Sequence, residues 1–204
     1  MWNIIQGAGW PIWPLIFASI LALAIIIERL WALRAEIIAP KNLLNEVRTL
    51  IDQKGVNKKS IDLLREHSYL GEIFATALDH ISSSPGLIKE SIEETGRAVF
   101  HKLEKYLSTL GTIATVAPLL GLFGTIIGMV ELFSSFTSSG ADVTVFARGI
   151  SIALYNTAGG IVVAVPAMIM YRFFKNKVVL TTRKIMITSK TSIRGIKFIS
   201  NSSC

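Results

Sequence analysis

Charged residues are scarce in this sequence. Lys, Arg, Asp and Glu make up 17% of its 204 residues, whereas soluble proteins carry about 25%. Three stretches contain none of them, namely residues 1–27, 106–130 and 149–171. Each is long enough to cross a bilayer, because a membrane-spanning helix needs about 20 apolar residues. The distribution excludes a soluble enzyme and predicts an all-α membrane protein with three transmembrane helices.

Cysteine is almost absent as well. The only one, Cys204, is the last residue, so no internal disulfide can form. The three histidines, His67, His80 and His101, do not have the spacing of metal ligands. No motif pairs a nucleophile with a base. We therefore expect no catalytic residue, no metal and no cofactor, and the protein is not expected to be an enzyme.

Acidic residues are missing from the C-terminal tail. The chain from Arg172 onward has eight basic residues and no acidic one, while residues 28–105 contain twelve of each. A basic tail after a membrane helix is first of all a topology signal, and binding to anionic lipid of the bilayer is the alternative. No nucleic-acid partner is expected.

The distribution of Lys and Arg also predicts the orientation. Only Arg148 of the 21 basic residues lies in the connection 131–148, and the side richer in Lys and Arg faces the cytoplasm. Seven segments follow: a periplasmic N-terminus (1–9), transmembrane helix 1 (10–31), a cytoplasmic helical region (32–105), transmembrane helix 2 (106–130), a periplasmic loop (131–148), transmembrane helix 3 (149–171) and a basic cytoplasmic tail (172–204). Trp10, Trp13 and Trp31 are expected as interfacial anchors.

The cytoplasmic region shows helical patterning. A first apolar stripe covers 43–51, a second helix is expected to start at a capping Ser60, and residues 82–86 predict a turn. From Leu87 no proline intervenes before Pro118, so the second span is expected to begin as one long cytoplasmic helix that runs into the membrane. Between Ser60 and the turn, one helical face carries Ile73, Phe74, Ala77, Leu78 and Ile81.

Small residues recur at helical spacing in the second and third spans. Membrane helices associate through small faces, so tight helix packing is the first interpretation and a narrow polar path is the second. The two faces consist of Gly111, Ala114, Pro118, Gly121, Thr125 and Gly128 in the second span, and of Ala153, Thr157, Gly160, Ala164 and Ala167 in the third.

Two threonines on these faces lie at a similar depth. Thr125 precedes Glu131 by six residues and Thr157 follows Gly149 by eight, which places both hydroxyls roughly 9–12 Å inside the outer boundary. A membrane threonine usually bonds its own helix, and lining a path is the alternative. No Asp, Glu or His lies inside a span, and a proton relay normally needs one. A partner must therefore supply the carboxylate if protons are conducted.

Three segments resemble the MotA/TolQ/ExbB proton-channel family. They are the exit from the first span at 27–34, the run APLLGLFGTIIGM at 117–129 and the run ISIALYNTAGGIVVAVPA at 150–167. The resemblance implies an inner-membrane homo-oligomer, a pentamer around a dimer of a one-span partner of the ExbD or TolR type. It also implies that the partner's membrane aspartate carries the proton and that the complex drives a TonB- or TolA-type transducer.

The same resemblance assigns residues. Thr125 and Thr157 match the pore-lining threonines, and Pro118 and Pro166 match the helix-breaking prolines. Gly121, Gly128 and Gly160 accompany them as the helix-packing and pore face. Many ExbB and TolQ members carry a glutamate where this chain has Ile152. ExbB-like service to TonB-dependent uptake is the first expectation and TolQ-like envelope maintenance the second. The flagellar branch is third, because it typically has four spans, and a non-conducting membrane scaffold is the alternative from another class.

Overall fold

The computed structural model describes residues 8–34, 38, 58–80, 83–134, 136–137, 140–141 and 143–202. Nearly all of them are helical, and three helices are long and apolar enough to cross a membrane. The expected all-α class with three such helices is therefore confirmed. The chain forms two compact units: residues 1–29 with 106–174, and residues 30–105 with 175–204.

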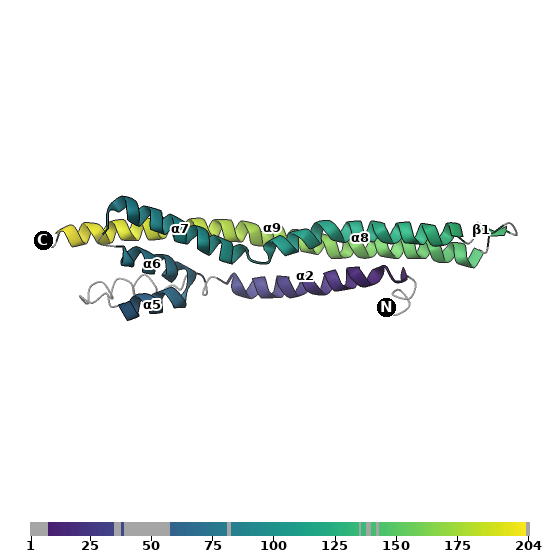
Figure 1. Ribbon diagram of the computed structural model, residues 1–204, viewed down its shortest axis with the longest axis horizontal. Helices are drawn as coiled ribbons and strands as arrows, with labels where there is room; N and C mark the ends of the chain where they lie inside the picture. Colours follow the sequence, from purple (N-terminus) through teal and green to yellow (C-terminus); the bar gives the residue numbers. More distant parts are fainter. Residues whose placement is uncertain are drawn as a thin grey trace. The chain divides into compact units, whose positions relative to one another are not determined.

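The first unit is built from three apolar helices. They are α2 (Ile12–Ala32), α8 (Leu107–Ser134) and the first part of α9 (Val143–Ser202), and Figure 1 shows α8 running alongside this part of α9. Leu15 of α2, Ala117 of α8 and Ala164 of α9 form a buried cluster, which joins all three helices. The Trp10 ring meets the Phe123 ring edge-on, with 6.2 Å between centroids.

A short hairpin connects α8 to α9. Its strands β1 (Phe136–Thr137) and β2 (Gly140–Ala141) pair in antiparallel register. At the helix ends beside this hairpin, the Arg148 guanidinium lies 3.5 Å from the Glu131 carboxylate. The Arg148 side chain is 66% exposed and that of Glu131 is 39% exposed, so the pair is in contact with solvent.

The second unit contains the polar helices. These are α5 (Lys58–His67), α6 (Tyr69–Asp79), α7 (Pro85–Glu104) and the second part of α9. The Ser68 hydroxyl caps α6 by accepting a 3.0 Å bond from the Gly71 amide. Ion pairs of 2.7 Å join Arg65 to Asp79 and Lys102 to Glu72. These ion pairs link α5 to α6 and α6 to α7; the Glu72 side chain is only 19% exposed, whereas the other three charges are solvated.

The predicted apolar face of α6 is largely confirmed, since Ile73, Phe74, Ala77 and Leu78 are buried. Ile81 and the stripe over 43–51 lie outside the described residues. The predicted start of α5 at Ser60 is wrong, because the helix already begins at Lys58.

The turn predicted over 82–86 is also wrong in its second half. Pro85 and Gly86 form the first turn of α7. The Ser84 hydroxyl caps this helix by accepting a 3.4 Å bond from the Leu87 amide, and proline at the first helical position loses no bond, because that N–H would be unpaired in any case.

The prediction of one unbroken helix from Leu87 into the membrane is wrong. The chain leaves α7 at Lys105 and adopts a left-handed conformation at Tyr106, with φ of 64°, before α8 begins. Such a φ costs a non-glycine residue roughly 1–2 kcal/mol. The Arg29 guanidinium lies 5.4 Å from the centroid of the Tyr106 ring, and a cation–π contact offsets part of this cost.

The third apolar helix is the one that continues well beyond its apolar stretch. α9 passes Pro166 and extends through the basic tail to Ser202. The tail after Lys177 is therefore helical as far as the structure describes it. From Lys175 onward this helix belongs to the second unit, in which Val178 and Ile185 are buried.

Candidate proton path between α8 and α9

The two helices proposed to line the path meet along glycines. A Cβ atom added to Gly121 of α8 would lie 2.9 Å from the Asn156 carbonyl oxygen, and one added to Gly160 of α9 would lie 2.8 Å from that of Ala117. Both distances are shorter than any real Cβ contact, so the two backbones touch directly. Close approach through small residues is how membrane helices gain packing energy.

The buried face of α8 differs from the predicted small face. Ala117, Gly121, Gly124 and Gly128 are buried, with steps of four, three and four residues. Pro118 and Thr125 each follow a buried residue directly, and one residue turns a helix by about 100°. Pro118 is accordingly exposed and Thr125 half-buried. Of the six small residues on the predicted face, Ala114, Gly121 and Gly128 are buried, Gly111 and Thr125 are half-buried, and Pro118 is exposed.

On α9 the predicted small face and the buried face share Gly160, Ala164 and Ala167. Its buried face in the membrane segment consists of Gly149, Ile152, Asn156, Gly160, Ala164 and Ala167. Thr157 is half-buried and Pro166 exposed. Of the predicted site residues, the structure brings Gly121, Gly128 and Gly160 into the contact and places both threonines at its margin.

The two threonine hydroxyls have the same hydrogen-bonding arrangement. Thr125 Oγ1 donates to the Leu122 carbonyl oxygen at 2.7 Å, and Thr157 Oγ1 donates to that of Ala153 at 3.1 Å. A hydroxyl has one hydrogen and two lone pairs, so each oxygen can still accept a bond. This arrangement suits a protonated carboxyl group or a water molecule as the donor better than it suits a carboxylate.

Charged side chains occur at the ends of the spans. At one end Arg29 is buried, with a side chain only 6% exposed, and its Nη2 donates to Glu28 Oε1 at 2.8 Å. At the other end is the pair of Glu131 and Arg148. Among the described residues no group of three or more His, Cys, Asp or Glu side chains is placed to hold a metal.

One buried polar residue received no role from the sequence. Asn156 is 0% exposed, and its Nδ2 donates to the carbonyl oxygens of Ala8 and Ile152 at 2.7 and 2.8 Å. The sequence could have indicated a role for this residue, because a carboxamide inside the charge-free stretch 149–171 needs hydrogen-bonding partners. The pattern of small residues drew attention instead to its neighbour Thr157.

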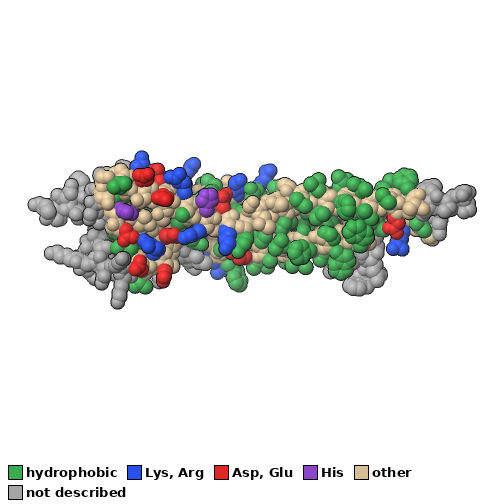
Figure 2. Space-filling model, viewed as in Figure 1, with side chains coloured by type: hydrophobic (Ala, Val, Ile, Leu, Met, Phe, Trp, Pro, Cys, Tyr) green, Lys and Arg blue, Asp and Glu red, His purple; other side chains and the backbone are tan. Residues whose placement is uncertain are grey.

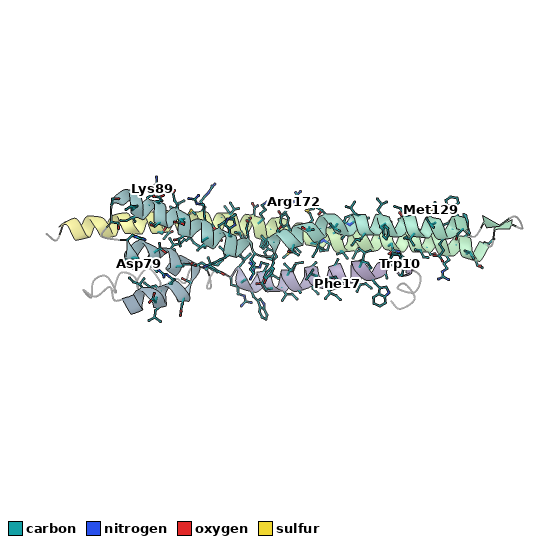
Figure 3. The ribbon with its side chains drawn as sticks, in the orientation of Figure 1. Trp10, Phe17, Asp79, Lys89, Met129 and Arg172 are labelled. Atoms are coloured by element: carbon teal, nitrogen blue, oxygen red, sulfur yellow. The ribbon has the colours of Figure 1, made fainter. Side chains whose placement is uncertain are left out.

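The outward faces of the first unit are apolar. Figure 2 shows hydrophobic side chains covering the visible face of this unit. Trp10, Phe17 and Met129 project outward (Figure 3) and are 61%, 70% and 44% exposed. Apolar exposure of this extent marks a membrane or protein contact.

Comparison with known proteins agrees with the resemblance. Residues 65–186 match the profile of the MotA/TolQ/ExbB proton channel family. The chain belongs to this family. It is a family of channel and transport subunits, and membership together with three apolar helices supports an inner-membrane location.

Individual relatives carry ExbB and TolQ names. An ExbB-like biopolymer transport protein of Synechocystis sp. is 30% identical over 80% of this chain and 66% of its own length. The biopolymer transport protein exbB1 of Vibrio cholerae is 29% identical over 80% of this chain and 74% of its own. The Tol-Pal system protein TolQ of Haemophilus influenzae is 31% identical over 77% of this chain and 74% of its own length. The chain thus spans 66% to 74% of the length of these relatives.

Proposed function

We propose that this chain is a subunit of an inner-membrane proton channel that couples the proton gradient to energy transduction across the periplasm. The observation that carries the proposal is the pair of hydroxyls at matched depth in two spans that contain no carboxylate. Thr125 and Thr157 each keep lone pairs free while donating to their own helix. Such a path can serve a proton carrier but cannot replace it.

The carrier is proposed to be an aspartate in the single span of an ExbD- or TolR-type partner. Five copies of this chain, the number that the family resemblance implies, would surround a dimer of that partner. The N-terminus and the hairpin would face the periplasm, and the second unit and the tail would face the cytoplasm. The lone Lys or Arg beside the hairpin, Arg148, supports this orientation.

Service to a TonB-type transducer in uptake is the first candidate role. The Synechocystis and Vibrio relatives, which carry biopolymer-transport names, support it. The Haemophilus TolQ relative supports a TolA-type transducer and envelope maintenance as the second. A non-conducting scaffold is the third candidate, and the back-bonded hydroxyls favour it, since a threonine with only a packing role also bonds its own helix.

Reconstitution tests the proposal. The chain is co-purified with the one-span protein encoded beside it, inserted in proteoliposomes, and assayed for proton flux under an imposed gradient. We expect flux with both proteins present and none with this chain alone. Replacing the partner's membrane aspartate by asparagine should abolish flux while leaving the complex assembled. Equal flux from that variant would contradict the proposal, and no flux from the intact complex would favour the scaffold.

A further inference from the structure

A tyrosine lies on a glycine where α8 and α9 meet at the end of their contact opposite the hairpin. A Cβ atom added to Gly111 of α8 would lie 3.1 Å from Cε2 and 3.2 Å from Cζ of the Tyr171 ring on α9. Both residues are half-buried and belong to the first unit. The aromatic ring thus occupies the space that a side chain at position 111 would need.

Gly111 and Tyr171 continue the lines of the two threonines along their helices. Intervals of seven residues give the two path lines, which are Thr125, Pro118 and Gly111 on α8, and Thr157, Ala164 and Tyr171 on α9. An interval of seven residues displaces a position by only about 20° around a helix, so each path line stays on one side. The Tyr171 ring therefore lies on the side of α9 that carries the Thr157 hydroxyl.

The stretch of α9 between these two residues is entirely apolar. Residues 158–170 read AGGIVVAVPAMIM, and none of these side chains carries an O–H or N–H group. Tyr171 follows Thr157 by 14 residues, which is about 21 Å along the helix, and the charged Arg172 comes directly after it. A tyrosine at a membrane boundary often serves as an interfacial anchor, but this ring packs on the backbone of the neighbouring helix instead.

We propose that Tyr171 is the gate at the cytoplasmic end of the candidate proton path. The inference rests on the proposed function, which supplies the path, its orientation and the ring of subunits. In that ring each copy contributes one tyrosine at the same level, and together they form an aromatic constriction. Apolar constrictions in channels exclude water by dewetting, so cytoplasmic water does not reach the threonines while the rings are in place.

The contact with Gly111 suits a gate that opens and closes. A proton carrier couples flow to motion only if it exchanges protons with one side at a time, so the path needs a barrier between the threonines and the cytoplasm. The ring of Tyr171 lies against a residue without a side chain, so rotation about its own side-chain bonds, between staggered rotamers, moves it away. Opening then requires no change in the backbone of either helix.

Cysteine accessibility tests the gate. Cys204 is the only cysteine, so Cys204→Ser removes all thiols, and Pro118→Cys then places one on the path line of α8, at an exposed position. The chain is produced with the one-span protein encoded beside it, and inside-out membrane vesicles are treated with a membrane-impermeant methanethiosulfonate. We expect slow labelling when Tyr171 is present and several-fold faster labelling in Tyr171→Ala. Equal rates would overturn the proposal.

Further variants distinguish the ring from other effects of substitution. Tyr171→Phe keeps the ring and should label as slowly as wild type, and fast labelling would overturn a gate made by the ring. Tyr171→Leu removes the ring but keeps an apolar side chain, so faster labelling of this variant decides the question where Tyr171→Ala does not assemble.

Tyr155→Ala is the matched control on the same helix. Tyr155 is 42% exposed and precedes Thr157 by two residues, which turn a helix by about 200°, so its ring lies away from the path line. Labelling of this variant should stay slow, and fast labelling would overturn the assignment to Tyr171. Because labelling needs no proton flux, a conducting complex with equal rates would contradict the gate alone, and a non-conducting complex with Tyr171-dependent labelling would contradict the channel alone.

Discussion

Gly128 of α8 and Gly149 of α9 approach so closely that a Cβ atom added to either would lie 2.7 or 2.8 Å from the other's carbonyl oxygen. The relationship is reciprocal, so neither residue can gain a side chain unless the helices separate. Gly121 and Gly128 of α8 together with Gly149 and Gly160 of α9 form a line of backbone contact within one subunit, which we call the seam. The seam holds the two proposed path helices in a fixed register, and it explains why their small residues need no neighbouring subunit to be buried.

Alanine substitutions at two adjacent glycines of α9 distinguish the effect of packing at the seam from the effect of helix propensity. Gly160→Ala should destabilise the protein by about 1–3 kcal/mol through overpacking, because the new methyl would lie 2.8 Å from the Ala117 carbonyl oxygen. Gly159→Ala should be neutral or stabilising, since its nearest contact would be 3.8 Å away, at Leu15, and alanine favours a helix. Thermal unfolding of the two purified variants is the measurement. Equal melting temperatures would show that α8 and α9 can separate freely.

Larger substitutions extend this test to assembly. Gly121→Leu should part α8 from α9 and weaken the homo-oligomer by about 1–3 kcal/mol per subunit contact, because overpacking disturbs the surfaces presented to neighbours. Native mass spectrometry of the variant, compared with wild type, gives the oligomer size. An unchanged oligomer would mean that the seam and the subunit contacts are independent.

The left-handed residue at the start of α8 predicts an unusual order of stabilities. Tyr106→Ala and Tyr106→Gly both lose the ring that lies beneath Arg29. Only glycine adopts a φ of 64° without strain, so the alanine variant should be less stable by about 1 kcal/mol. Denaturant unfolding of both variants measures the difference. An alanine variant as stable as the glycine variant would mean that α7 and α8 can join as one straight helix.

The orientation can be tested with reporter fusions. Fusions at Ser60 and Asn201 should report the cytoplasm, and a fusion at Ser138 the periplasm, because twenty of the 21 Lys and Arg residues lie outside the connection that contains Ser138. Alkaline phosphatase and green fluorescent protein give opposite signals and serve as mutual controls. A periplasmic signal from position 60 would invert the proposed topology.

Composition alone was enough to predict the three apolar helices. A charge-free stretch of more than 20 residues has few other solutions than a membrane helix, and α2, α8 and α9 follow from it. The break at Tyr106 could not be predicted in this way. Neither Lys105 nor Tyr106 is a helix breaker, and the left-handed turn accompanies a contact with Arg29, which is 77 residues away.

The candidate site was predictable to the same extent. Spacing placed Gly121, Gly128 and Gly160 on the packing faces, but steps of three and four residues also admit Pro118 and Thr125, which lie about 60–80° from the centre of the buried face of α8. Which of two adjacent faces packs inward depends on the partner helix. Asn156 escaped notice for a related reason, since its role depends on a carbonyl at Ala8 that no local pattern announces.

The threonines decide between channel and scaffold. Thr125→Val and Thr157→Val keep the volume and branching of the side chain and remove its hydroxyl. Loss of the hydrogen bond from the hydroxyl to its own helix is nearly neutral for stability. In a channel the partner's carboxyl group would lose an acceptor, at a cost of about 1–3 kcal/mol. Proton flux in proteoliposomes should therefore fall roughly tenfold or more with insertion and assembly unchanged. A scaffold should tolerate both variants.

The matched controls are the isoleucines that lie off the contact. Ile126 and Ile161 are 53% and 52% exposed, and Ile126→Val and Ile161→Val remove one methylene each and keep the β-branching without touching a hydroxyl. They should retain wild-type flux, because methyl groups take no part in hydrogen bonding. If Thr125→Val and Thr157→Val also retain it, neither hydroxyl serves the proton, and the small faces of α8 and α9 exist to hold the helices together.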